Sequence, residues 1–238
     1  MKKLIVVIVF ISVVANLAWA QTGKVKGNGN FQIKEIAVGS FKHLRYQSCL
    51  NLIITNQVSK IKIEADENII PLVSVSIENE DLIIEDIDNK WFSSKEILKI
   101  YIPAQQLGSF ENYGSGNISI EEEMNIPTFK FNNQGSGNIT LRLKTNQLEM
   151  EDTGSGNITI LGQAQNIRLS LRGSGNLNAK QLQTEVAEVA LNGSGNATIN
   201  CAEDLNVTIS GTGNLSYIGN PKLEKQLNST GKIFAVSK

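Results

Sequence analysis

The sequence has few of the residues that most often carry catalysis or bind metals. Among 238 residues there is one histidine, His43, and there are two cysteines, Cys49 and Cys201. No two of these are spaced as a ligand pair, so the sequence predicts neither a metal site nor a cofactor. The two cysteines lie far apart in the chain. In an exported protein they either form a disulfide or remain two buried thiols.

Neither sign of charge dominates. The chain has 22 Lys and Arg against 23 Asp and Glu, a net charge of −1. Without Lys2 and Lys3, which belong to the segment described next, 20 basic side chains face 23 acidic ones, a net charge of −3. No basic cluster stands out. We therefore expect neither nucleic acid nor an anionic membrane as a partner.

Long apolar runs are absent except at the N-terminus. The stretch from Leu4 to Val14 follows two lysines and precedes Ala18-Trp19-Ala20, which is the pattern of a signal peptide over residues 1–20. The run is too short to span a membrane, and no later run approaches that length. No cysteine follows the cleavage site to carry a lipid. We expect export to the periplasm, the cell surface or the exterior, and a single all-β domain from Gln21 to Lys238.

Glycine is abundant: twelve of the 20 glycines fall in one repeated motif. Gly114-Ser115-Gly116-Asn117 returns every 18 to 21 residues. An apolar, a small polar and usually another apolar residue follow each copy, which is typical of a half-buried strand. Alternating apolar residues such as Ile167, Leu169 and Leu171 precede the next copy and predict a second strand. Between the two strands, polar stretches such as residues 144–147 read as turns.

This pattern fits either an antiparallel meander or a parallel β-solenoid. Outward positions five residues before successive motifs alternate in charge. In a solenoid these positions stack about 4.8 Å apart, which makes opposite charges neighbours and favours the solenoid. They are Lys130, Glu149, Arg168, Glu188 and Asn206.

The motif predicts a corner of each coil. Glycine can adopt a positive φ there without a Cβ clash, and the asparagine amides can bond to one another along the axis. The expected corner residues are Gly114, Gly116, Asn117, Gly135, Gly137, Asn138, Gly154, Gly156, Asn157, Gly173, Gly175, Asn176, Gly193, Gly195, Asn196, Gly211, Gly213 and Asn214.

The part before the repeats, residues 27–110, is β-rich but irregular and is expected to cap one end of the solenoid. Glu78-Asn79-Glu80-Asp81 predicts a hairpin turn within it. The coils and a second cap occupy residues 111–238, with Asn220-Pro221 and the charged stretch from Lys222 to Lys225 blunting the other end. The expected strands of the first part are Leu50–Thr55, Ile61–Glu64, Val73–Ile77, Leu82–Glu85 and Leu98–Ile102.

The export signal, the ADEN sequence at Ala65 to Asn68, the recurring GSGN-I-T and the YIGNP sequence at Tyr217 to Pro221 together resemble the head GIN domain family of auto-transporter adhesins, common in Bacteroidetes. The resemblance covers essentially the whole chain after residue 20. It implies a right-handed, single-stranded parallel β-helix related in shape to pectin lyases, and a binding role. It brings no catalytic residues with it.

Two ligand-binding readings of the glycine motif are disfavoured. A dinucleotide fingerprint requires a third glycine and a following helix, and neither is present. Calcium-binding β-rolls need an aspartate in each turn and a period near nine, whereas here the turn residue is asparagine and the period is twice as long.

The expected function is that of a non-catalytic extracytoplasmic binding or adhesion module. A polysaccharide-cleaving enzyme is the main alternative, because Glu149 and Glu151 lie two apart on one strand and face outward together. A purely structural envelope protein is the third possibility. Fold alone does not decide among them.

The expected binding face is a flat column of small polar residues beside the asparagines. Such a column suits a glycan or an extracellular or envelope protein, although Ser and Thr also simply suit an exposed strand. The column consists of Ser119, Thr140, Thr159, Asn178, Thr198 and Ser216.

Overall fold

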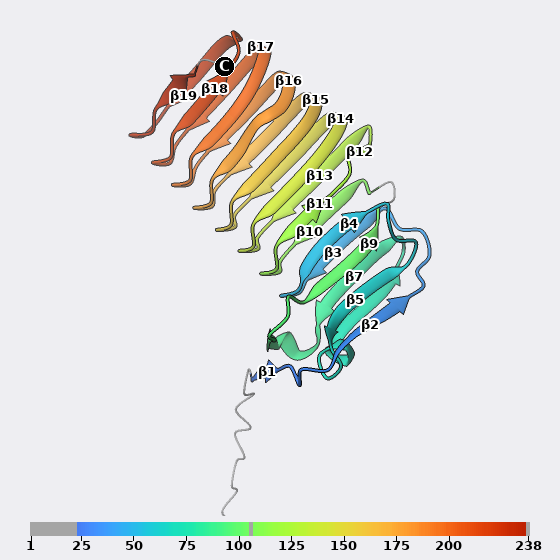
Figure 1. Cartoon of the computed structure of the whole chain (residues 1–238). Helices are drawn as coiled ribbons and strands as arrows, with labels where there is room; N and C mark the ends of the chain where they lie inside the picture. Colours follow the sequence, from blue (N-terminus) through green and yellow to red (C-terminus); the bar gives the residue numbers. More distant parts are fainter. Residues whose placement is uncertain (1–22, 105–106, 237–238) are drawn as a thin grey trace, which may run out of the picture.

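The structure, a computed structural model, describes residues 23–104 and 107–236, so the expected signal peptide lies outside the described residues. The chain is nearly all β, with 61% strand and 3% helix, and winds into a β-solenoid of about seven turns. The coils stack along one axis toward the C-terminal end (Figure 1). This confirms the expected fold class.

Four long strands form the regular middle of the solenoid. Each pairs in parallel with the next, which confirms the solenoid and rules out a meander. Apolar side chains at every second position point inward, because a strand directs successive side chains to opposite faces. The strands are β14 (Ile139–Asp152), β15 (Ile158–Leu171), β16 (Leu177–Leu191) and β17 (Ala197–Ile209).

Shorter strands continue both sheet faces on either side. On the N-terminal side these are β10 (Ser109–Asn112), β11 (Ile118–Ile120), β12 (Met124–Asn125) and β13 (Thr128–Asn133). On the C-terminal side, β18 (Leu215–Ile218) and β19 (Lys222–Leu227) pair with β17, and β20 (Ile233–Ala235) pairs with β18.

The N-terminal part contains the expected strands, and the solenoid register extends into it. β3 and β4 pair in parallel with β10 and β11, whereas β2 pairs antiparallel with β5, and β6 antiparallel with β7. The elements are β1 (Lys24–Lys26), β2 (Phe31–Ile36), β3 (His43–Gln47), β4 (Asn51–Thr55), β5 (Ile61–Asp66), η1 (Ile70–Leu72), β6 (Val73–Glu78), β7 (Asp81–Asp86), η2 (Ile87–Asn89), β8 (Trp91–Ser93) and β9 (Lys99–Pro103).

The hairpin turn between β6 and β7 is confirmed. Asn79 and Glu80 both have positive φ, 51° and 71°. Two successive left-handed residues make the tight turn whose twist suits an antiparallel pair. β6 therefore pairs antiparallel with β7, whereas β7 itself pairs in parallel with β3 and continues the solenoid register.

The corner glycines do not adopt the expected positive φ; in the described residues only Gly29, Gly162 and Gly219 do so among glycines. The expectation was wrong because the glycines serve a different purpose. A Cβ added to Gly156 would overlap the carbonyl oxygen of Gly137 in the preceding coil, and one added to Gly137 would overlap that of Gly116. The glycines are needed because successive coils approach backbone to backbone at this corner.

The asparagine ladder is confirmed, but its main link is a backbone donor. The N–H of Asn138 donates to Oδ1 of Asn117 at 2.9 Å, and the same bond recurs up to Asn214 at 2.9 to 3.0 Å. Side-chain amide bonds accompany it from Asn176 onward. Each amide oxygen thus satisfies the free N–H of the next corner.

The expected outward charge column is also present. Lys130, Glu149, Arg168, Glu188 and Asn206 are register partners in sequence. Lys130 Nζ lies 2.9 Å from Glu149, and the Arg168 guanidinium lies 2.8 Å from Glu188. Cys49 and Cys201 are free thiols.

Candidate functional site

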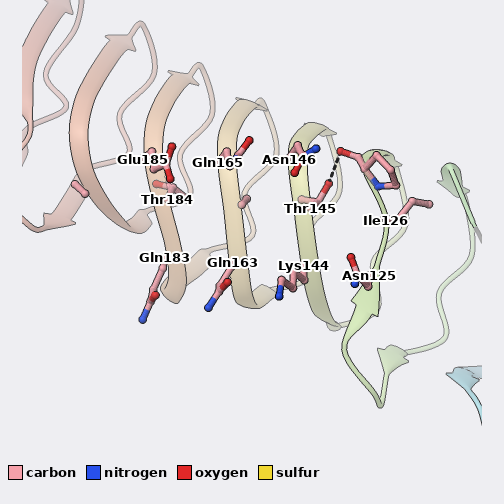
Figure 2. Close-up of a pocket in the computed structure, with 13 residues that line it drawn as sticks. Asn125, Ile126, Lys144, Thr145, Asn146, Gln163, Gln165, Gln183, Thr184 and Glu185 are labelled. Carbon is pink, nitrogen blue, oxygen red and sulfur yellow. Dashed lines mark hydrogen bonds between the residues drawn. The ribbon is translucent and has the colours of Figure 1, made fainter.

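A groove of about 510 Å³ runs along the solenoid at the bend between its two sheet faces. The long strands pass through this bend without a break, so the residues expected to form polar turns are strand residues instead. Figure 2 shows the coils side by side, with polar side chains projecting on both sides of the bend. The groove crosses β12, β14, β15 and β16 and ends at Ala202 of β17.

The side chains along the groove form two exposed rows. Register pairing stacks Asn125 on Lys144, Lys144 on Gln163 and Gln163 on Gln183 in the first row. The second row is formed by Asn146, Gln165 and Glu185, which project on the opposite side of the bend (Figure 2). Five of these seven side chains are primary amides, each of which can donate and accept hydrogen bonds.

The residues between the two rows are buried and already satisfied. The Thr145 hydroxyl donates to the Pro127 carbonyl oxygen at 3.1 Å, and the Thr184 hydroxyl donates to the Asn200 carbonyl oxygen at 2.8 Å. Ala164 lies between these threonines in register. Both hydroxyls of the floor thus already have partners, so a ligand would find its polar partners in the amide rows.

The charge of the groove is low and balanced. Lys144 is in the first row and Glu185 in the second, and the remaining row residues are neutral. Register shifts lie close to the site: one between Thr159 and Leu161 where β15 meets β16, and two where β16 meets β17, between Ala179 and Gln183 and between Thr184 and Val186. Such a bulge re-aims side chains at the end of a regular stretch. The arrangement suits a neutral, extended ligand with many hydroxyl groups.

The column expected as the binding face is assembled as the sequence indicated. Each member is the register partner of the next, and Asn178 is exposed while the other five are half-buried. Ile53 precedes the column and Phe234 follows it. None of its residues lines the groove. Its role as a binding face stays a prediction.

The two carboxylates considered for catalysis are both held in surface ion pairs. Glu149 pairs with Lys130 and also accepts a hydrogen bond from Gln147 Nε2 at 3.0 Å. Glu151 pairs with Arg172 at 2.8 Å. Neither carboxylate lines the groove; Glu151 lines a separate pocket of about 240 Å³, and Glu149 does not line that one either.

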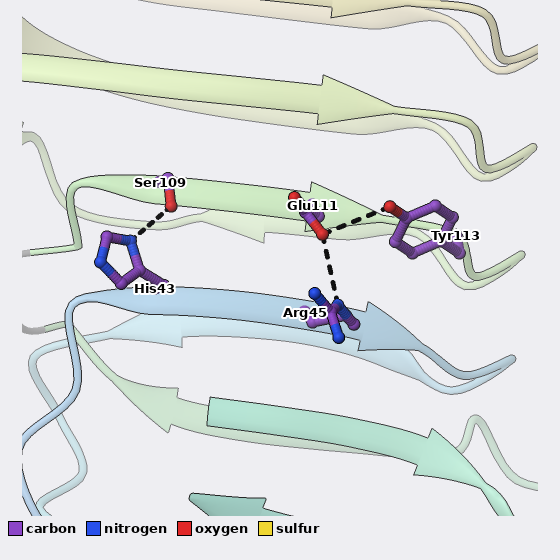
Figure 3. Close-up of polar contacts among 5 residues, drawn as sticks. All are labelled: His43, Arg45, Ser109, Glu111 and Tyr113. Carbon is purple, nitrogen blue, oxygen red and sulfur yellow. Dashed lines mark hydrogen bonds and ion pairs between the residues drawn. The ribbon is translucent and has the colours of Figure 1, made fainter. Parts of the chain in front are cut away.

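A second polar cluster lies on the outer face of β3 and β10 (Figure 3). His43 Nδ1 is 2.6 Å from Ser109 Oγ, and Arg45 Nε is 3.3 Å from Glu111 Oε2. Tyr113 donates its hydroxyl to the same Glu111 oxygen at 3.3 Å. Asp81 is the register partner of His43 across β7. Ser109 and Glu111 are half-buried and the other members drawn in Figure 3 are exposed, and the residues of β3 and β10 line a small pocket of about 160 Å³.

Two absences hold for the described ranges, 23–104 and 107–236. No three His, Cys, Asp or Glu side chains there gather as metal ligands. No helix in those ranges is long and apolar enough to cross a membrane.

The groove was missed by sequence reasoning, although a signal was present. Gln163 and Gln183 occupy equivalent places in successive repeats, as do Asn146, Gln165 and Glu185. Their polarity alone predicts turns. The signal is an amide side chain that recurs at one position of successive repeats. It lies inside a strand that is long enough to continue without a loop.

Comparison with known proteins supports the fold. Residues 40–221 match the family described as "Putative auto-transporter adhesin, head GIN domain". A solved structure described as a putative adhesin from Bacteroides fragilis is 23% identical, with a TM-score of 0.83, and the match covers 89% of this chain and 100% of that one. No curated protein matches the chain.

Two structures from Parabacteroides distasonis are similar as well. One is described as a putative adhesin, at 21% identity and a TM-score of 0.70, and the match covers 90% of this chain and all of that one. The other is described as a putative lipid binding protein, at 22% identity and a TM-score of 0.71, with the same coverage of both chains. At these identities the likeness concerns the fold alone.

Proposed function

The chain belongs to the family described as "Putative auto-transporter adhesin, head GIN domain", and from this premise we propose that it is a non-catalytic, extracytoplasmic adhesion module that holds a glycan chain in the amide-lined groove. The family name suggests adhesion and a place outside the cell. The stacked row of amides in the groove is the observation that supports a glycan as the ligand.

Stacked coils place equivalent side chains about 4.8 Å apart along the axis. That interval is comparable to the length of one sugar residue in an extended polysaccharide. Asn125, Gln163 and Gln183 repeat at this interval with Lys144 between them. Amides donate and accept, so they match hydroxyl groups that do the same. The row therefore presents one polar group to each successive sugar.

The same groove argues against two other ligand classes, a lipid and a protein. A lipid chain requires a lining that is apolar throughout, whereas here two polar rows with one charge of each sign accompany the apolar residues Ile126, Ala164 and Ala202. A protein interface of ordinary strength buries a larger and more varied surface than one shallow groove offers. A glycan fits the groove's length and polarity best.

The test is a polysaccharide and matrix-protein array on the chain from Gln21 to Lys238, run beside a reducing-end release assay. We expect binding to at least one neutral polysaccharide without turnover. Gln183→Ala should weaken that binding by roughly 2- to 10-fold, the range that loss of one hydrogen bond gives. Gln181→Ala, on the same strand outside the groove, is the matched control.

Other outcomes point elsewhere. Turnover that Glu149→Gln abolishes would support the enzyme. Binding that bulky substitutions at Thr140 and Thr159 remove, while Gln183→Ala does not, would move the site to the flat column. Binding to matrix proteins alone would contradict the glycan, and no binding at all would favour a structural role.

A further inference from the structure

Two large aromatic side chains are exposed on the N-terminal side of the molecule and share one pocket. Trp91 is 61% exposed and Tyr113 is 40% exposed. Both line a pocket of about 270 Å³ at the glycine corner of the coil. Exposed Trp and Tyr residues of this kind are typical of binding sites, because they offer a large rigid surface with a polar tip.

Four separate segments build the pocket. Gln47, Ser48 and Cys49 lie at the end of β3, and Tyr113 leads into the first glycine corner at the end of β10. The next corner adds Gln134 and Ser136, and the η2–β8 segment adds Trp91. Figure 3 shows Tyr113 just beyond the β10 arrowhead, at the start of the corner. The site thus exists only where the solenoid meets its N-terminal part.

The pocket is held in place by its surroundings. Ser48 Oγ donates to Asp86 Oδ1 at 2.6 Å, and the Cys49 N–H donates to Asp86 Oδ2 at 2.8 Å. Gln47 Nε2 donates to Asn89 Oδ1 at 3.1 Å, and Asn89 itself has a positive φ of 50°. Asp88 has a positive φ of 57° as well, and these two residue types tolerate the left-handed conformation that turns the chain from η2 into β8.

The lining is mixed and carries one acidic residue, Asp86, and one basic residue, Lys90, among neutral groups. The amides of Gln47, Asn89 and Gln134 and the hydroxyl of Ser136 stand beside the two aromatic rings. Lys90 is the one basic residue of the lining, and it pairs with Asp88 at 3.1 Å. Burial raises the pKa of the Cys49 thiol to about 11, so this thiol stays protonated and is no nucleophile at neutral pH.

We infer that this pocket binds a single neutral pyranose ring, such as the end residue of a glycan. A pyranose has an apolar C–H face that lies flat on an aromatic ring and a rim of hydroxyls that amides can bond. The volume is slightly below the range of drug-sized pockets, about 300–1,000 Å³, and suits one ring. The inference is independent of the groove, which lies at the opposite bend of the coil.

The sequence supplies a direct probe of this site. The chain has two tryptophans, Trp19 in the predicted signal peptide and Trp91 in the pocket, so Trp91 is the only one in the chain from Gln21. Its fluorescence can be followed in titrations with methyl glycosides of glucose, galactose and N-acetylglucosamine, up to roughly 50 mM, a weak but measurable range. Glycerol serves as the non-sugar control.

We expect a saturable emission change with at least one glycoside and none with glycerol. Tyr113→Ala and Gln134→Ala should each weaken binding by roughly 10-fold, as loss of a main contact does. Gln183→Ala, in the groove, should leave this titration unchanged while it weakens polysaccharide binding. Gln134 is exposed, so its substitution tests the site even if Tyr113→Ala fails to fold.

Two results would overturn the inference. One is the absence of a saturable change with every glycoside in the folded protein. The other is a change that persists at full affinity in both Tyr113→Ala and Gln134→Ala. Loss of the signal in Gln183→Ala but not in these variants would assign the sugar to the groove alone.

Discussion

At the scale of single residues, the corner glycines show how a correct motif can have an unexpected cause. Gly156 lacks the positive φ that the motif suggested, and its missing Cβ leaves room for the Gly137 carbonyl of the preceding coil. The residue type was therefore predictable from the repeat. The reason for it depends on the distance between coils, which a single repeat does not contain.

Gly156→Ala should destabilise the fold by about 1–3 kcal/mol, the cost typical of overpacking. In a chain of this size that corresponds to a loss of roughly 2–4 °C in Tm for each kcal/mol. Gly39→Ala is the matched control, because a Cβ there meets nothing within 4 Å, and we expect it to change Tm little. Thermal unfolding by circular dichroism measures both.

Gly156→Asn separates the two explanations for the glycine. Asparagine tolerates a positive φ better than alanine does, so it would rescue a left-handed corner but not a crowded one. We expect Asn and Ala to be equally harmful at this position. Recovery of the wild-type Tm by Asn would restore the conformational explanation.

A second residue-scale feature is a buried polar ladder that the sequence did not reveal. Asn112 Nδ2 donates to Asn133 Oδ1 at 2.7 Å, and Asn133 Nδ2 donates to Asp152 Oδ1 at 2.7 Å. Burial raises the pKa of Asp152, while the donors from Asn133 and Gly154 lower it in part. The ladder ends on a buried carboxylate that pays a desolvation cost when charged.

Asp152→Asn should raise Tm at pH 7 and lose that advantage in acid. Because the folded pKa is above the ordinary value of 3.8, the folded state binds the proton more readily than the unfolded state does. Wild type therefore gains stability from this group as the pH falls through the raised pKa toward 3.8. The variant gains none, so the difference in Tm should shrink between pH 7 and pH 4.

The comparison is best made by calorimetry of both proteins at the two pH values. A gain of about 1 kcal/mol would appear as roughly 2–4 °C at pH 7. Other carboxylates titrate in both proteins and cancel in the difference. A variant that is less stable than wild type at pH 7 would contradict the assignment of a desolvation cost to Asp152.

At the scale of elements, the alternation of apolar and polar residues predicted the strands and their faces correctly, whereas polar stretches did not predict the turns correctly. The inward residues Ile167, Leu169 and Leu171 and the outward column from Lys130 to Asn206 were predictable, because the period of two and the repeat length fix both faces. Even the β6–β7 hairpin had a local signal in its turn residues. What a repeat encodes locally can be read from it.

The bend between the sheet faces is where this reasoning failed. Lys144 and Asn146 were expected in a turn, yet β14 continues from Ile139 to Asp152 in register with β15. A strand can change direction without a loop when each neighbour bends at the same place, and only the stack shows this. The groove was not predicted because the bend that forms it was not predicted. The Trp91 pocket was not predicted because it joins segments that are distant in sequence.

At the scale of the whole molecule, a parallel solenoid must protect two ends. At the N-terminal end the antiparallel strands β2 and β6 cover the coils. At the other end β19 and β20 pair on one side only within the described residues. Leu227, Phe234 and Val236 are 45–47% exposed there. An open edge with apolar residues is a template for pairing with another chain.

The strand register shows that Lys225 disfavours pairing at that edge. Lys225 pairs with Val207, whose column points into the core through Val189 and Leu169. The lysine therefore takes an inward position on the edge strand, where its charge opposes the docking of a further coil. The sequence indicated a charged, blunted end here, and the structure assigns the inward position to Lys225.

Lys225→Val should allow the C-terminal edge to pair with a second copy of the protein. The substitution continues the apolar column to the edge and removes the charge that another coil would have to bury. We expect concentration-dependent association, measured by sedimentation velocity across about a 100-fold concentration range so that a micromolar Kd would be visible, while Tm stays level or rises. Lys222→Val is the matched control, since Lys222 is outward and pairs with Glu224 at 3.0 Å. Equal association of the two variants would attribute the effect to added surface hydrophobicity, and a monomeric Lys225→Val would show that the edge needs no guard.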